Sequence, residues 1–194
     1  MMPKLGMEPI RKAALVKATI SEIGRVGSLD VTVTQIAKRA GMSSALAHHY
    51  FGSKEEMFLA AMRHILTLYG AEVRGALALA EGPQWRVRAV LAASFSPANF
   101  RREAVGAWLN FWVLAQTVPE AKRLLAVYQR RLRSNLLAGL RPLAGARAEA
   151  LADGLGALID GLYLREVLKS GPPDGAAAVA TALAYLDAQL RIKD

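Results

Sequence analysis

Two short helices joined by a tight turn are predicted for residues 31–50, and this pattern restricts the fold of the chain more than any other feature. The first helix has apolar residues at the spacing of one helix face, at Val33, Ile36, Ala37 and Ala40. Thr32 and Gln35 stand three residues apart at its start, as in a capping box. Glycine tolerates the left-handed backbone of a sharp turn, so we expect this helix to end at Gly41.

The second helix has an outward face of short, polar or donor-rich side chains. Ser43 or Ser44 can cap this helix, which we expect to continue to about Tyr50. The outward residues suit an approach to base edges and phosphates in a major groove: Ser44, Ala45, His48 and His49. The pattern is typical of a DNA-binding helix-turn-helix, although the same spacing also fits a two-helix corner of any all-helical protein.

Positive charge is concentrated around this helix pair. Residues 1–54 contain eight Lys or Arg and three Asp or Glu, a net charge of +5, whereas the other 140 residues have a net charge of +4. A basic surface binds polyanions by displacing their counterions. It also fits a solvated face or a membrane-surface patch. Because the charge coincides with the helix pair, we favour double-stranded DNA as the partner.

The composition excludes several other classes of protein. The chain has 194 residues, 53% of them hydrophobic, which is ample for a buried core. It has no Cys and so forms neither disulfides nor thiolate metal sites, in agreement with a reducing cytosol. The opening residues lack the apolar core of a signal peptide, and no later run reaches the roughly 18 apolar residues of a membrane span. We expect a cytoplasmic protein with no membrane partner.

The sequence does not predict catalysis or a bound metal. Its histidines are His48, His49 and His64. His48 and His49 are neighbours on a helix and point about 100° apart, so they cannot chelate one ion in the usual i, i+4 manner. A Cys nucleophile, a Gly-rich phosphate loop and a paired-carboxylate motif are all missing from the sequence. We expect no enzymatic activity, no metal and no cofactor.

Helical periodicity continues through the rest of the chain and predicts an all-α fold. The first helix is expected at about residues 8–26. A fourth helix begins at Ser53, where Ser53 and Glu56 have the spacing of a second capping box, and breaks after it leave about five further helices. We expect a three-helix DNA-binding head at residues 8–68 and a larger helical body at residues 69–194.

These residues together resemble the signature of the TetR family of bacterial one-component repressors. The shared pattern is Thr32, Ile36, Ala37, Ala40, Gly41, Ser43, Tyr50, Phe51 and Lys54. The resemblance extends over the whole chain. It implies a three-helix head, and a body that binds a small molecule and dimerises through its last two helices. The family usually has an aromatic residue where this chain has His48.

Two kinds of DNA contact are expected from the helix pair. Tyr50 and Lys54 lie where a phenol hydroxyl, an amine and free helix N–H groups can hold phosphates. Base reading is expected from Ser44, Ala45, His48 and His49, with Thr34 at the groove edge. Thr32 and Ser43 complete the expected DNA-binding set.

The body contains an aromatic face and an isolated acid. Three aromatic residues share one side of a predicted helix: Trp108, Phe111 and Trp112. Asp160 and Tyr163 are similarly paired on another helix. Rings and one carboxylate suit a quaternary ammonium, which has no N–H to donate. The acid lies in an apolar run, where a charge is costly unless paired, and Arg165 or an interfacial Arg could pair it. Core packing is the alternative for the rings.

A stripe of mostly small residues follows the same helix as the acid: Gly154, Ala157, Gly161 and Leu168. Small residues permit close helix approach, so we expect a dimer interface here, with packing inside one subunit as the alternative. The C-terminal helix adds Leu183 and Leu186 to this bundle. A palindromic operator needs two heads, which favours the homodimer.

A narrower set of segments resembles the choline-responsive branch of this family, which represses the genes of glycine betaine synthesis. These segments are residues 3–7, 108–112, 131–136 and 157–162. The resemblance implies a homodimeric repressor released from a palindromic operator by choline or a related quaternary ammonium compound, such as betaine aldehyde. A sensor of another cationic or hydrophobic ligand, such as a multidrug sensor, is the alternative.

Overall fold

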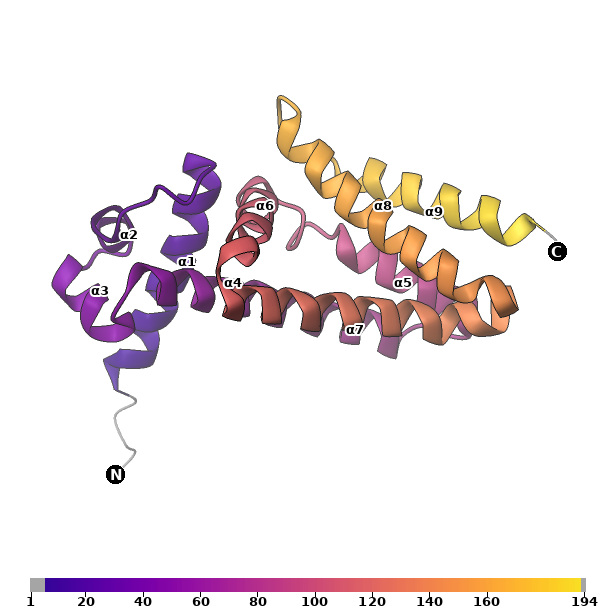
Figure 1. Ribbon diagram of the computed structural model, residues 1–194, viewed down its shortest axis with the longest axis horizontal. Coiled ribbons are helices and arrows are strands. Elements are labelled where there is room, and N and C mark those ends of the chain that lie inside the picture. Colours follow the sequence, from indigo (N-terminus) through magenta and orange to yellow (C-terminus); the bar gives the residue numbers. More distant parts are fainter. Residues whose placement is uncertain (1–5, 193–194) are drawn as a thin grey trace.

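The computed structural model describes residues 6–192, so residues 3–5 of the opening segment compared above lie outside it. Its helices are α1 (Met7–Val26), α2 (Val33–Arg39), α3 (Ser44–Phe51), α4 (Lys54–Ala78), α5 (Pro83–Ser94), α6 (Arg102–Thr117), α7 (Pro119–Ala144), the short 3₁₀ helix η1 (Gly145–Arg147), α8 (Ala148–Leu168) and α9 (Gly175–Arg191) (Figure 1). No strand occurs within the described range. The all-α prediction is confirmed.

The head consists of α1, α2 and α3, which lie together at one end of the molecule in Figure 1. Thr32 and Gln35 form the predicted capping box at the start of α2. Gly41 has a φ of +69°, the left-handed backbone that the turn requires. Ser43, rather than Ser44, caps α3 by accepting a hydrogen bond from the Leu46 N–H at 3.2 Å. Local signals therefore determine the form of the helix pair.

A buried carboxylate fastens α2 to α1. Glu22 is 4% exposed and accepts a hydrogen bond of 2.8 Å from Arg25 on α1, together with one from Arg39 at the end of α2. The hydrogen bond from Arg25, supported by the one from Arg39, holds the pKa of Glu22 below its usual value. The carboxylate thus stays charged and fixes the angle between the two helices.

The second predicted capping box forms only in part. Ser53 caps α4 by accepting from the Glu56 N–H at 3.1 Å. The Ser53 N–H donates instead to the Phe51 carbonyl at 2.8 Å, so it is not available to the Glu56 side chain. The prediction of the reciprocal bond from Glu56 is wrong, because the turn after α3 already uses its donor.

The body is a bundle in which the long helices α4 and α7 lie beside one another and α5 packs against both (Figure 1). Helix α8 packs on α6 and α7, and α9 covers α8 and α5. Helix α4 runs unbroken through the expected division between residues 68 and 69. It therefore connects the head to the body as one rigid element.

Helix α6 makes the closest approach of the body to the head. A Cβ atom at Gly24 of α1 would lie 2.5 Å from the Glu103 Cα of α6, closer than real atoms allow. Across the same contact, a Cβ atom at Gly106 would lie 3.3 Å from the Gly24 Cα. The two helix backbones touch here, and a movement of α6 must displace α1.

Candidate functional site

The turn-facing residues of the helix pair are held by local hydrogen bonds. The Thr32 hydroxyl accepts from the Gln35 N–H at 3.2 Å. The Ser44 hydroxyl donates to the Thr34 hydroxyl at 3.2 Å, which ties the first turn of α3 to α2. Thr32, Thr34 and Ser43 are exposed, and Ser44 is half-buried. These hydrogen bonds hold the side chains in place at the solvent-facing side of the helix pair.

The outward face of α3 contains both histidines. Ala45, His48 and His49 are exposed. The Nδ1 atom of His48 lies 3.1 Å from the Gly52 carbonyl oxygen, which can only accept, so Nδ1 carries the proton of this bond. This bond leaves Nε2 of His48 for another partner. The ring centroid of His49 lies 5.3 Å from that of Tyr50.

Tyr50 and Lys54 are linked to α1 and to the loop after it. The Tyr50 hydroxyl lies 3.4 Å from a donating Nη1 of Arg11, and the Lys12 Nζ lies 6.0 Å from the centre of the Tyr50 ring. Lys54 is exposed and donates to the Leu29 carbonyl at 3.2 Å. The sequence shows that Arg11 and Lys12 are cationic. It does not place them beside Tyr50, because α1 and α3 come into contact only in the folded protein.

The body brings together some of the predicted ligand residues. The Trp108 ring lies 6.3 Å from Tyr163 and 6.5 Å from Trp112, centroid to centroid. Trp108 and Tyr163 are buried, whereas Trp112 is half-buried. Phe111 is 0% exposed, and no other ring of the described chain pairs with it. Its spacing is explained by core packing, the alternative that the sequence left open.

Sequence reasoning missed four further rings of this cluster. Tyr128 of α7 lies 4.8 Å from Trp108 and 5.3 Å from Tyr69 of α4, centroid to centroid. Phe95 and Phe100 lie 5.9 Å and 4.8 Å from Tyr163. The only sequence signal of Tyr69 and Tyr128 was helical apolar spacing, which a core residue shows equally, and Phe95 and Phe100 lie in the segment between α5 and α6. We refer to Tyr69, Trp108, Tyr128 and Tyr163 below as the aromatic cluster.

Asp160 lies beside this cluster without a partner. Burial raises the pKa of Tyr69, Tyr128 and Tyr163, and the negative charge of Asp160 adds a smaller effect in each case, so Asp160 lies within electrostatic reach of all three hydroxyls. Asp160 is half-buried, and burial raises its own pKa to about 6. Within residues 6–192 it has no hydrogen bond or ion pair. Arg165, suggested above as its partner, is exposed and does not pair with it.

A second acid and a cavity lie close to the cluster. Glu72 of α4 accepts a hydrogen bond of 2.6 Å from Asn99 Nδ2, and its charge also raises the pKa of Tyr163. The Tyr163 hydroxyl donates to the Ser94 carbonyl at 2.6 Å. Tyr69 and Tyr128 line a cavity of about 330 Å³ between α4 and α7. The same cavity is also lined by Arg74 and Arg131, whereas Asp160, Trp108 and Tyr163 do not line it.

Comparison with known proteins identifies the family. Residues 15–61 match the family described as bacterial regulatory proteins, tetR family, and residues 83–191 match the BetI-type transcriptional repressor, C-terminal domain. The chain is 50% identical over 190 residues to the HTH-type transcriptional regulator BetI of Brucella suis, covering 97% of this chain and 96% of the relative. The chain belongs to the TetR family. Its C-terminal domain is of the BetI type.

Further relatives agree with this assignment. The BetI regulator of Rhizobium meliloti is 49% identical over 98% of this TetR-family chain and 94% of its own length. A putative transcriptional regulator from Pseudomonas aeruginosa has a TM-score of 0.79 and 28% identity, covering 96% of this chain and 93% of that one. The relatives are transcriptional regulators, so the predictions of a DNA-binding repressor without enzymatic activity or a cofactor are confirmed.

One structural neighbour is informative for the fold alone. A putative transcriptional regulator from Saccharomonospora viridis, determined in complex with choline, has a TM-score of 0.78 and 20% identity. It covers 91% of this TetR-family chain and 95% of its own. The head and body arrangement is therefore shared well beyond close relatives.

The predicted interface residues of this TetR-family chain fall into two groups. Gly154 faces α9, since a Cβ atom there would lie 2.8 Å from the Tyr185 hydroxyl, and Leu186 is 0% exposed. Both are accounted for by packing within one subunit. Ala157 and Leu168 are exposed, and a Cβ atom at Gly161 would meet no atom within 4 Å. These last three residues form an open stripe along α8, with Leu183 half-buried on α9.

Neither a membrane-spanning helix nor a metal-binding group occurs in the part of this TetR-family chain that the structure describes. None of its helices combines the length and the apolar character needed to cross a membrane. Its His, Asp and Glu residues form no group of three that could hold a metal ion.

Proposed function

We propose that this repressor controls the genes that convert choline to glycine betaine, and that choline or a related quaternary ammonium compound releases it from its operator. The observation that carries the proposal is the unpartnered Asp160 carboxylate beside the aromatic cluster. A partly buried carboxylate without a counter-ion is costly, and a cationic ligand removes that cost.

The chemistry of the cluster favours a quaternary ammonium over other cations. Such a cation offers no N–H group, so hydrogen-bond acceptors alone bind it poorly. Ring faces attract it by about 0.5–2 kcal/mol each. Trp108 and Tyr163 of the cluster and the neighbouring, half-buried Trp112 supply the faces, and Asp160 supplies the opposite charge. The choline complex of the Saccharomonospora neighbour and the BetI relatives support this ligand class.

We propose that the repressor acts as a homodimer. Each subunit has a DNA-binding head at residues 8–68 and a ligand-binding body at residues 69–194. The open stripe of α8, with Ala157, Gly161 and Leu168, supports this assembly, because it is apolar and meets no atom of its own chain at Gly161. Two heads related by a two-fold axis match a palindromic operator in double-stranded DNA.

A thermal-shift panel on the purified protein tests the ligand. Choline and betaine aldehyde should each raise the unfolding midpoint in a saturable manner. The neutral analogue 3,3-dimethylbutan-1-ol, in which carbon replaces the ammonium nitrogen, should raise it far less. Equal shifts for choline and the neutral alcohol would exclude a charge-reading site. A response only to larger hydrophobic cations would indicate a multidrug sensor instead.

Lys54 is proposed to hold a DNA phosphate together with Tyr50. Lys54→Ala should weaken binding to all duplex sequences and reduce the slope of log affinity against log salt by about one unit. Fluorescence anisotropy at four salt concentrations measures this slope. The control is Lys122→Ala, an exposed cation on α7. An unchanged slope for Lys54→Ala would remove this residue from the DNA interface.

We propose that the outward face of α3 reads the bases, with Thr34 at its edge. The residues of this face are Ser44, Ala45, His48 and His49. The capping residues Thr32 and Ser43, at the starts of α2 and α3, complete the proposed DNA-binding set. His48→Ala and His49→Ala should each reduce the preference for operator over scrambled DNA by about 1–3 kcal/mol. Competition binding with both duplexes measures the preference. If both variants still discriminate like the parent protein, the reading face lies elsewhere.

A further inference from the structure

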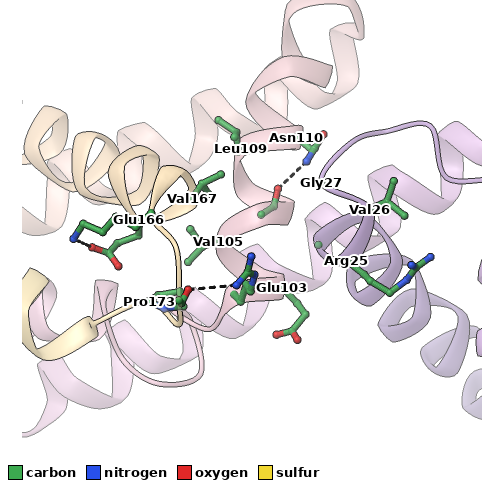
Figure 2. Close-up of a pocket in the computed structure, with 15 residues that line it drawn as sticks. Arg25, Val26, Gly27, Glu103, Val105, Leu109, Asn110, Glu166, Val167 and Pro173 are labelled. Atoms are coloured by element: carbon green, nitrogen blue, oxygen red, sulfur yellow. Dashed lines mark hydrogen bonds and ion pairs between the residues drawn. The ribbon is translucent and has the colours of Figure 1, made fainter.

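Another cavity lies at the junction of head and body. It has a volume of about 660 Å³ and is bordered by α1, α4 and the start of α6. Three cationic or titratable side chains line it, one from each helix or its cap: Lys17, His64 and Arg101. Ile20 and Leu68 supply an apolar wall. The cavity differs from the neighbouring one of about 440 Å³ in Figure 2, which lies between α1, α6 and the end of α8.

The two cations of this cavity form no ion pair, and they outnumber its one acid. Lys17 and Arg101 are exposed, and their side chains form no hydrogen bond or ion pair within the described part of the chain. Burial lowers the pKa of His64, and the charges of Lys17 and Arg101 lower it further, so both cations lie within electrostatic reach of this ring. Glu103 is the one acid that lines the cavity, and no side chain of residues 6–192 pairs with it.

We propose that this cavity binds a small organic phosphate. Arg101 offers a planar fork that suits phosphate oxygens, and Lys17 offers a second charge from a different helix. The volume exceeds what the phosphate group alone occupies, and the apolar wall of Ile20 and Leu68 accommodates the carbon part of an ester. Both negative charges of a phosphate monoester are then matched by cations from different helices.

Such a ligand joins the head to the body. Lys17 belongs to α1 of the head, whereas Arg101 caps α6 of the body. A bound dianion removes the repulsion between these two cations and ties both helices to His64 on α4. Because it needs neither choline nor operator, this site is independent of the proposed function and can be tested without either ligand.

Inorganic phosphate is the probe for the full-length protein, at constant ionic strength set with chloride. Calorimetric titration should show saturable binding that Lys17→Gln and Arg101→Gln each weaken about tenfold, the effect of losing one charge-assisted hydrogen bond. Lys122→Gln, on α7, should leave the affinity unchanged. Lys54→Ala should also leave it unchanged, which separates this cavity from phosphate contacts of the DNA-binding face.

A spectroscopic readout distinguishes ligand contact from a general stabilising effect. Phosphate should raise the pKa of His64, measured from its ring protons by NMR, because the anion offsets Lys17 and Arg101. Glycerol 2-phosphate should bind at least as tightly as inorganic phosphate, because its carbon part reaches the apolar wall. The proposal is overturned if phosphate does not saturate, if the two cavity variants bind like the parent protein, or if the pKa of His64 does not move.

Discussion

Asp160→Asn should abolish the response to choline while leaving the fold intact. The substitution keeps the volume of the side chain and removes a negative charge near the aromatic cluster that no hydrogen bond or ion pair of the described chain compensates. The attraction between a carboxylate and a quaternary ammonium about 4 Å apart is roughly 1–4 kcal/mol, so choline affinity should fall by about tenfold or more. Operator affinity without choline should stay within about twofold of the parent value, because the head is a separate part of the molecule.

The matched control for this variant is Asp153→Asn. Asp153 lies on the same helix, is exposed and bonds to Arg133 at 2.7 Å. Its replacement should not change choline binding. A choline response of wild-type strength in Asp160→Asn would assign that carboxylate a purely structural role.

The response to choline should also depend on pH. Burial raises the pKa of Asp160 to about 6, from a usual value of 3.8. The charged form that attracts choline predominates above pH 6, and affinity should fall by about tenfold per unit below it. In the free protein the raised pKa means that ionisation opposes folding, so Asp160→Asn should raise the unfolding midpoint at pH 7.5 without choline. Thermal unfolding and calorimetry between pH 5 and 8 measure both effects.

Gly24→Ala should destabilise the protein, although alanine is the better helix former. The new methyl group would lie 2.5 Å from the Glu103 Cα and 2.7 Å from its carbonyl oxygen, and neither backbone atom can rotate away. Overpacking of this kind costs about 1–3 kcal/mol, against a helix-propensity gain of at most about 1 kcal/mol. The free energy of unfolding should therefore fall by about 1–2 kcal/mol.

Gly75→Ala supplies the control for the glycine substitution. Gly75 lies in α4, and a Cβ atom there would meet nothing within 4 Å. At this position only the higher helix propensity of alanine acts, so the free energy of unfolding should rise by about 0.5–1 kcal/mol. Urea unfolding at equilibrium measures both variants. If Gly24→Ala stabilised the protein as much as Gly75→Ala, the close contact between α1 and α6 would not exist in solution.

The head could be predicted almost completely because its signals are local. Thr32, Gly41 and Ser43 each act within four residues along the chain, and the structure has the caps and the left-handed turn where they were expected. The prediction of a reciprocal bond from Glu56 was wrong for an equally local reason, because the Ser53 N–H donates to the Phe51 carbonyl in the turn after α3.

The proposed effector site could be predicted only in part because its residues come from several helices. Trp108 and Tyr163 were found from their spacing, but Tyr69 and Tyr128 join them only through the packing of α4 and α7. Periodicity cannot separate a ring that lines a site from one that fills a core. Phe111 illustrates this limit, because it shares the spacing of Trp108 and is fully buried.

The most direct test of choline release is to measure choline affinity with and without operator DNA. A duplex selected from genomic fragments serves as the operator, and calorimetry at fixed salt gives both dissociation constants. Linkage requires that operator weaken choline binding by the same factor as choline weakens operator binding, a factor of about 5–150 for typical allosteric proteins. We predict equal factors in this range, and their loss in Asp160→Asn. Identical choline affinity for free and operator-bound protein would contradict the account.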